Sequence, residues 1–202
     1  MQSIIDIVLI EAVKDEKAIH HIPNTDIKLI IPTQFNPYEE ERVTQSGTVI
    51  SAPLYYTYKD KDGKEKRSND IKIKKGDKIY CHHFLTHDEN FVSENLWKDD
   101  YSNIYCRVVD GEIEMVGRWN FLEIVKKKDK VGEIILVHKD DKEVGVGIIK
   151  HPSDFMKSQG IKEGMLIEFK KNAGYIMVVE GKKFYRIEDD LILLAHTEIS
   201  NG

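Results

Sequence analysis

Two cysteines and three histidines near the middle of the chain are the residues best suited to bind a metal ion. Cys81, His82 and His83 are consecutive, His87 follows them, and Cys106 is the second cysteine of the chain. Thiolate and imidazole groups of this kind are typical Zn²⁺ ligands. The spacing argues against a zinc site, because neighbouring side chains on a strand point to opposite faces and no Cys-x-x-Cys pair is present. We therefore expect no metal site, and leave open whether Cys81, His83 and Cys106 meet.

Other residues that support catalysis occur without the neighbours that catalysis needs. Ser51 and Ser153 lack the strand-to-helix motif of an activated serine. The Gly-rich stretch 145–147 has neither the third glycine nor the following helix that phosphate binding requires. The carboxylates at 39–41 and 188–190 are typical of solvated turns rather than of an acid and base pair. The sequence therefore predicts a protein that is not an enzyme and that holds no cofactor.

The composition is that of a globular protein. The 202 residues include 30 Lys and Arg against 35 Asp and Glu, for a net charge of −5, and 41% are hydrophobic. This balance offers no concentrated basic surface, so we expect no nucleic-acid partner. The best apolar run, Ile4–Ile10, contains Asp6 and falls short of the roughly 18 residues that a membrane span needs. With two cysteines and no signal-peptide pattern, we expect a reducing, cytoplasmic location and no membrane partner.

Short runs rich in Ile, Val, Tyr and Phe dominate the chain and predict β-strands. We expect strands at 26–31, 47–50, 54–58, 77–84, 104–109, 113–116, 133–137, 146–149, 165–169, 175–179 and 184–187. Hairpin turns are indicated by Asp62-Gly63, Asp110-Gly111 and Glu180-Gly181, which tolerate positive φ. One short helix is predicted at Asp154–Gln159, with Ser153 as its N-cap and Gly160 as its end. The fold class is therefore all-β.

The chain also contains an internal repeat. Four blocks recur in the same order: 47–53 with 146–152, 73–79 with 161–167, 108–111 with 178–181, and 119–125 with 190–195. The charged segment 126–130 cannot enter a core, so we expect it to link a first domain, 1–125, to a second domain, 131–202. On this alignment residues 85–103 form an insertion in the first copy. Its aromatic residues, Trp97 among them, either cover their own barrel or contact another subunit.

The repeated blocks resemble the GroES co-chaperonin family. The resemblance rests on the turn Ile161-Lys162-Glu163-Gly164 before a core strand, the turn Asn172-Ala173-Gly174-Tyr175, and the final strand 191–195. The first copy adds a roof-like hairpin at 55–66 that the second lacks. The resemblance covers residues 26–125 and 131–196. It implies two tandem GroES-like small β-barrels, assembly into a homo-oligomeric ring, and a non-enzymatic role in protein folding as the cap of a chaperonin.

The resemblance further implies that a loop after the first strand of each barrel binds the chaperonin. In the first copy we assign this loop to Gln34–Ser46, where Phe35, Tyr38 and Val43 are the apolar groups and the family's hydrophobic tripeptide is missing. In the second copy the loop shrinks to the charged residues 138–143. An alternative therefore stays open, in which the chain is a structural or assembly component, a ring or collar in a virion or other large complex, without a chaperonin partner.

Overall fold

The computed structural model describes residues 5–12, 19–21, 28–30, 45–59, 62–82, 85–86, 88–125, 144–170 and 174–196. The strands of the first half are β1 (Ile7–Glu11), β2 (Ile19–His21), β3 (Lys28–Ile30), β4 (Gln45–Ser51), β5 (Tyr56–Lys59), β6 (Glu65–Ser68), β7 (Lys78–Cys81), β8 (Phe91–Ser93), β9 (Leu96–Asp100), β10 (Ile104–Val109) and β11 (Glu112–Met115). The second half contains β12 (Trp119–Ile124), β13 (Val144–His151), helix α1 (Asp154–Ser158), β14 (Leu166–Lys170), β15 (Tyr175–Val179), β16 (Lys182–Glu188) and β17 (Ile192–His196).

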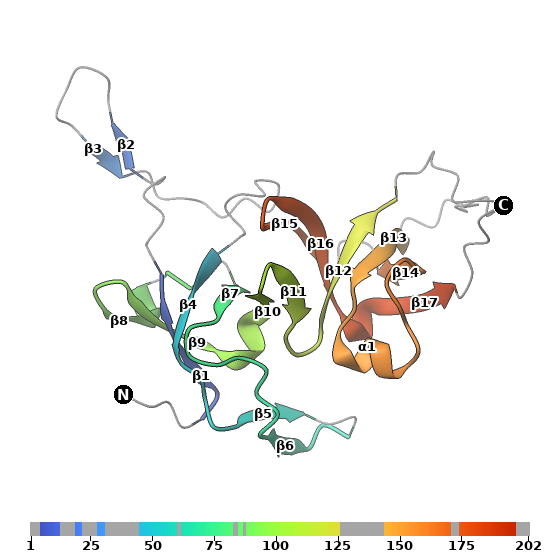
Figure 1. Cartoon of the computed structure of the whole chain (residues 1–202), viewed down its shortest axis with the longest axis horizontal. Coiled ribbons are helices and arrows are strands. Elements are labelled where there is room, and N and C mark those ends of the chain that lie inside the picture. Colours follow the sequence, from blue (N-terminus) through green and yellow to red (C-terminus); the bar gives the residue numbers. More distant parts are fainter. Residues whose placement is uncertain are drawn as a thin grey trace.

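These strands form two main antiparallel sheets, which confirms the all-β prediction. The first has the order β11-β10-β7-β4-β1-β9-β8, and the second has the order β15-β16-β12-β13-β14-β17. Figure 1 shows them as two lobes, with β8 and β17 at opposite ends and β10, β11, β15 and β16 in the middle. The end strands of each order are not hydrogen-bonded to each other, so closure into barrels stays a prediction. No helix of the described residues is both long and apolar enough to cross a membrane.

Local turn chemistry places the hairpins and the helix where the sequence predicts them. Asp110 and Gly111 have φ values of 51° and 84° between β10 and β11, and Glu180 and Gly181 have 48° and 74° between β15 and β16. Two successive residues with positive φ match the twist of antiparallel strands. The side chain of Ser153 accepts a hydrogen bond from the amide of Met156 and caps α1, as predicted.

The two sheets repeat the same strand ladder. Ile10 of β1 lies opposite Val49 of β4, and Leu122 of β12 lies opposite Ile149 of β13. A bulge precedes each of these pairs, after Leu9 in β1 and after Phe121 in β12. Bulges change the twist of a strand at a defined point. Their recurrence at the same ladder position makes β12 and β13 the structural counterparts of β1 and β4.

The remaining strands extend this equivalence. The pair Cys106 and Tyr80 between β10 and β7 corresponds to the pair Leu194 and Glu168 between β17 and β14. In both ladders a bulge comes next, after Tyr80 along β7 and after Glu168 along β14. β9 pairs with β1 in the same register in which β16 pairs with β12, so β9 and β16 are also equivalent. A 3-10 turn joins each to the following strand, η3 (Tyr101–Asn103) in the first copy and η4 (Asp189–Leu191) in the second. The predicted internal repeat is therefore present in the described structure.

The structure corrects the alignment of two of the four repeated blocks. The sequence pattern aligns residues 119–125 with the end of the second copy, but β12 begins that copy and pairs with β13 and β16. The pattern also aligns the turn at Asp110-Gly111 with the turn at Glu180-Gly181, yet β10 corresponds to β17 rather than to β15. Turn signals are local and recur in every hairpin, so they do not distinguish one hairpin from another. The sheets divide between Met115 and Trp119, and the predicted linker 126–130 lies outside the described residues.

The predicted insertion at 85–103 is part of the first sheet. Strands β8 and β9 hold the place that β15 and β16 hold in the second sheet. Trp97 and Tyr101 are buried in the first core with 4% and 3% exposure, so they pack against their own sheet. Their contact with another subunit, the other predicted role, is excluded by this burial. Phe91, in contrast, is 53% exposed and packs edge-on against Trp97.

The two cores use equivalent positions, and a polar residue replaces an apolar or aromatic one at some of them. Val49 and Ile79 in the first core correspond to Ile149 and Ile167 in the second. The roof-like hairpin predicted for the first copy is formed by β5 and β6, and α1 stands at that point of the second copy. Buried Tyr101 of the first copy corresponds to buried Asp189 in the second, which receives hydrogen bonds instead of apolar contacts.

Candidate functional site

The residues predicted to bind a chaperonin cannot be placed. Phe35, Tyr38 and Val43 lie outside the described residues, as do His83 and His87 of the predicted cysteine and histidine group. The remaining candidates lie where the two equivalent sheets meet and where their exposed faces differ.

Both cysteines are interior residues. Cys81 and Cys106 lie on the neighbouring strands β7 and β10 and have no exposed surface. Burial raises the pKa of both thiols, and these side chains point to different cores. A buried thiol with a raised pKa is a poor metal ligand and a poor nucleophile. Within the described part of the chain, no group of three His, Cys, Asp or Glu side chains is placed to hold a metal ion.

A buried polar cluster is present in the second copy. Asp189 is 3% exposed, and its Oδ1 accepts hydrogen bonds from Asn120 Nδ2 at 2.8 Å and from Ser153 Oγ at 2.7 Å. Asn120 Oδ1 in turn accepts from the amide of Ser153 at 2.7 Å. The prediction that residues 188–190 are solvated is therefore wrong for Asp189. Burial raises the pKa of its carboxyl group, and the hydrogen bonds from Ser153 and Asn120 oppose that change.

This cluster is structural rather than catalytic. Ser153 Oγ donates to Asp189 and accepts from the amide of Met156, so its hydroxyl is fully engaged in capping α1. A nucleophilic serine needs a base that takes its proton and an open path to substrate. Ser153 has 0% exposure, so the open path to substrate is missing. The network instead fixes η4 and the start of α1 to β12.

The main feature that joins the copies is an apolar junction. It contains eight buried residues, drawn from both sheets: Tyr80, Tyr105, Cys106, Met115, Phe121, Met177, Val179 and Phe184. The rings of Phe121 and Phe184 stack with centroids 5.1 Å apart. Burial of large aromatic side chains is among the strongest contributions to a stable contact. The two sheets are therefore packed as one unit through this junction.

Arg186 lies at the centre of the junction. Its guanidinium carbon is 4.3 Å from the ring centroids of both Tyr105 and Trp119 and 4.9 Å from that of Tyr175. The residue is 5% exposed, and burial lowers the pKa of its guanidinium group. Aromatic faces attract a cation, and Arg stacks on them well. Arg186 therefore links β16 of the second copy to β10 of the first.

Polar contacts border the junction. Lys78 of β7 forms an ion pair with Glu180, and Tyr80 Oη donates to Glu180 Oε1 at 2.8 Å. The hydrogen bond with Glu180 raises the pKa of Lys78, and the hydrogen bond from Lys78 lowers the pKa of Glu180. Trp119 Nε1 donates to the carbonyl of Ser102 at 3.0 Å. These contacts fix the orientation of one copy relative to the other.

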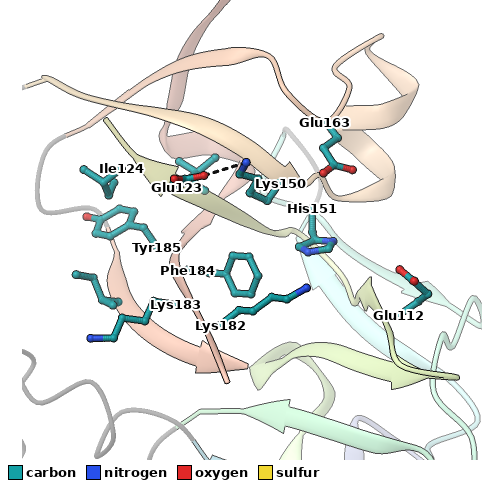
Figure 2. A pocket seen from close by; sticks show the side chains of 12 residues that line it. Glu112, Glu123, Ile124, Lys150, His151, Glu163, Lys182, Lys183, Phe184 and Tyr185 are labelled. Atoms are coloured by element: carbon teal, nitrogen blue, oxygen red, sulfur yellow. Dashed lines mark ion pairs between the residues drawn. The ribbon is translucent and has the colours of Figure 1, made fainter. Parts of the chain in front are cut away.

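A cleft of about 690 Å³ lies beside the junction. Figure 2 shows its lining, with the ion pair between Glu123 and Lys150 at 2.9 Å and with His151 next to Phe184. The lining also includes Glu112 and the basic and acidic residues Lys182, Lys183 and Glu163. Burial lowers the pKa of His151. Interspersed charges of both signs cancel the field that would select a charged ligand. The cleft therefore indicates no ligand class.

Sequence reasoning missed the junction and its central cation. Arg186 and Tyr105 lie in different copies and far apart in the sequence, and neither belongs to a recognisable motif. One signal was available, because the strands that carry Tyr105 and Phe184 were predicted and each contains an aromatic residue.

Comparison with known proteins gave no match to a family model and no match to a curated protein.

Proposed function

We propose that the chain is a non-enzymatic, co-chaperonin-like protein that assembles with copies of itself into a ring and caps a chaperonin. One observation carries the proposal: two structurally equivalent copies pack side by side through an apolar junction. Each copy presents a different face to that junction, which makes the contact head-to-tail. A head-to-tail contact repeated with a constant rotation closes into a ring when that rotation divides a full turn, and otherwise forms an open filament.

The corrected alignment also moves the expected partner-binding loops. In the resemblance, the chaperonin-binding loop follows the first strand of each copy, and these strands are β1 and β12. These loops then correspond to residues 13–44 and 126–143, which lie outside the described residues except for the short paired strands β2 and β3. The first contains Phe35, Tyr38 and Val43. The second contains Gly132 followed by the apolar run 134–137, which supports a chaperonin contact from the second copy as well.

The engagement of polar side chains supports a role without catalysis. Ser153 and Asp189 are occupied by structural hydrogen bonds, and Cys81 and Cys106 are buried in packed cores. Binding in a ring does not need reactive groups, because many weak loop contacts add up when they are held on one particle. The proposed function therefore rests on geometry and apolar contacts.

A structural role in a larger assembly is the second candidate. It is favoured by the first loop, in which Phe35, Tyr38 and Val43 are separated by polar, proline and charged residues instead of forming an apolar tripeptide. In that case the same ring would form, and the loops would contact neighbouring subunits. The two candidates share the assembly and differ in the partner.

Co-sedimentation with a purified bacterial chaperonin, with and without nucleotide, tests the proposal. We expect wild-type protein to sediment with the chaperonin in the presence of nucleotide. The double variants Tyr38→Ala/Val43→Asp and Ile135→Asp/Leu136→Asp should each weaken binding while the oligomer persists. Phe155→Asp, at an exposed site on α1, serves as the control. An oligomer that never binds would support the second candidate, and loss of the oligomer in the loop variants would do the same.

A further inference from the structure

The face that the first copy presents to the junction has an exposed counterpart in the second copy. Tyr105 and Cys106 of β10 are buried in the junction with 2% and 0% exposure. Their ladder counterparts on β17 are Leu193 and Leu194, which are 46% and 57% exposed. A bulge opposite this part of β17 interrupts the strict alternation of side chains, and a contiguous exposed apolar patch is typical of a surface that a partner covers. We name this face the β17 surface. Glu168 lies opposite Leu194 in the ladder, and its Oε1 is 2.8 Å from Nε2 of His196.

The opposite face of the junction also has a counterpart, in the first copy. Phe121 and Arg186 lie opposite each other in the second sheet, and Leu9 and Lys98 hold the same ladder positions in the first. Trp119 corresponds to Ile7. Lys98 is exposed, Ile7 and Leu96 are partly buried, and Leu9 is buried with 6% exposure. We name the three residues with accessible surface, Ile7, Leu96 and Lys98, the β1–β9 surface.

The two surfaces lie at opposite ends of the molecule, as the positions of β9 and β17 in Figure 1 show. They are therefore available to different neighbours at the same time. They are also compatible in chemistry, because each is mainly apolar and the acidic Glu168 of one matches the basic Lys98 of the other. Within the chain, the equivalent residues already pack against each other at the junction.

From this equivalence we infer that the β17 surface of one chain docks on the β1–β9 surface of a second copy of the same chain. The contact repeats between chains the junction that exists within each chain. Leu193 then takes the place of Tyr105, and the stem of Lys98 takes the place of Arg186. This inference rests on the proposed ring and names its interface, but it requires no chaperonin.

Variants that block one surface at a time test the inference by mass photometry and size-exclusion chromatography. Leu193→Asp/Leu194→Asp blocks the β17 surface, and Leu96→Asp blocks the β1–β9 surface. Lys98→Asp blocks the latter at an exposed residue, in case Leu96→Asp does not fold. The controls are Phe155→Asp and Leu54→Asp, whose parent residues are 48% and 53% exposed and lie outside both surfaces.

We expect wild-type protein and both controls to assemble at micromolar concentration, and each blocked variant to remain a single chain of 23.4 kDa. An equal mixture of the two blocked variants should form dimers of twice that mass and nothing larger, because only one productive contact remains. A wild-type monomer, or blocked variants that assemble like wild type, would overturn the inference. Mixtures that stay monomeric, or that form large particles, would do so too.

Failure of this inference is distinguishable from failure of the proposed function. If the chain assembles through other residues and still sediments with a chaperonin, the interface is wrong and the function stands. If the mixture behaves as expected but no chaperonin is bound, the interface stands and the cap function fails.

Discussion

Gly76 and Gly164 hold the same position in the two copies. The amide of Gly76 donates to the carbonyl of Val49 at 2.8 Å, and the amide of Gly164 donates to the carbonyl of Ile149 at 2.8 Å. Their φ values are 92° and 88°. Each glycine precedes an equivalent strand, β7 in the first sheet and β14 in the second, so the two copies depend on the same backbone conformation.

Replacing either glycine with alanine should destabilise the protein to a similar extent. No atom lies within 4 Å of a Cβ added at either position, so the cost comes from the backbone conformation rather than from a clash. A side chain at this φ costs about 1–2 kcal/mol. Urea unfolding of Gly76→Ala and Gly164→Ala measures it, with Lys75→Ala as the exposed neighbour. Equal stability of all three variants would show that a side chain at these two turns carries no backbone cost, and a loss at only one glycine would show that the turns are not equivalent.

Arg186→Met should weaken the junction. The variant keeps an apolar stem of similar length but removes the cation that faces Tyr105 and Trp119. We expect a loss of about 1–3 kcal/mol in the free energy of unfolding. Arg67→Met is the matched control, because Arg67 lies 5.1 Å from the ring of Tyr55 at an exposed position. A control that loses as much stability as Arg186→Met would contradict a special role for the junction cation.

The carboxyl group of Asp189 should make stability depend on pH. Its pKa is raised above 3.8 in the folded state because it is buried. The folded protein therefore holds this proton to higher pH than the unfolded chain. Stability contributed by the protonated group is lost as pH rises from 3.8 through the raised pKa.

Asp189→Asn removes this titration and keeps an oxygen that accepts from Ser153 and Asn120. The stability of the variant relative to wild type should therefore rise with pH across that range, as measured by thermal unfolding at a series of pH values. Asp190→Asn, at an exposed neighbouring site, controls for general charge effects. A constant difference between Asp189→Asn and wild type at every pH would refute the assigned role of burial.

Both thiols should be protected in the folded protein. Cys81 and Cys106 are fully buried, and burial raises the pKa of each. A thiol-reactive dye at neutral pH should label neither cysteine in native buffer and both in denaturant, because the thiolate is the reactive form. Rapid labelling of either residue in native buffer would mean that its core opens readily.

The sequence was informative where one residue fixes one local conformation. Ser153 identified the start of α1, and Gly111 and Gly181 identified their hairpins, because caps and tight turns depend on local chemistry. The turn glycines Gly76 and Gly164 identified the repeat for the same reason. The wrong alignment of residues 119–125 arose because an apolar strand is compatible with either end of a β-domain. Its place is fixed by bulges and register, which are set by distant partners.

The junction was not predictable for a similar reason. Arginine side chains usually lie on the protein surface, so the sequence does not predict that Arg186 is buried. Its buried site exists only because the rings of Tyr105, Trp119 and Tyr175 surround the guanidinium group. The exposed pair Leu193 and Leu194 looks like an ordinary core strand in the sequence. Its significance appears only when its counterparts in β10 are seen to be buried.

Electron microscopy of the wild-type chain mixed with a bacterial chaperonin and nucleotide tests the central claim most directly. We expect closed rings seated on the ends of the chaperonin, with two similar lobes for every chain, because each chain carries two equivalent copies joined head-to-tail. Bare chaperonin ends beside single chains or open filaments would contradict the claim that this protein is a ring-forming cap.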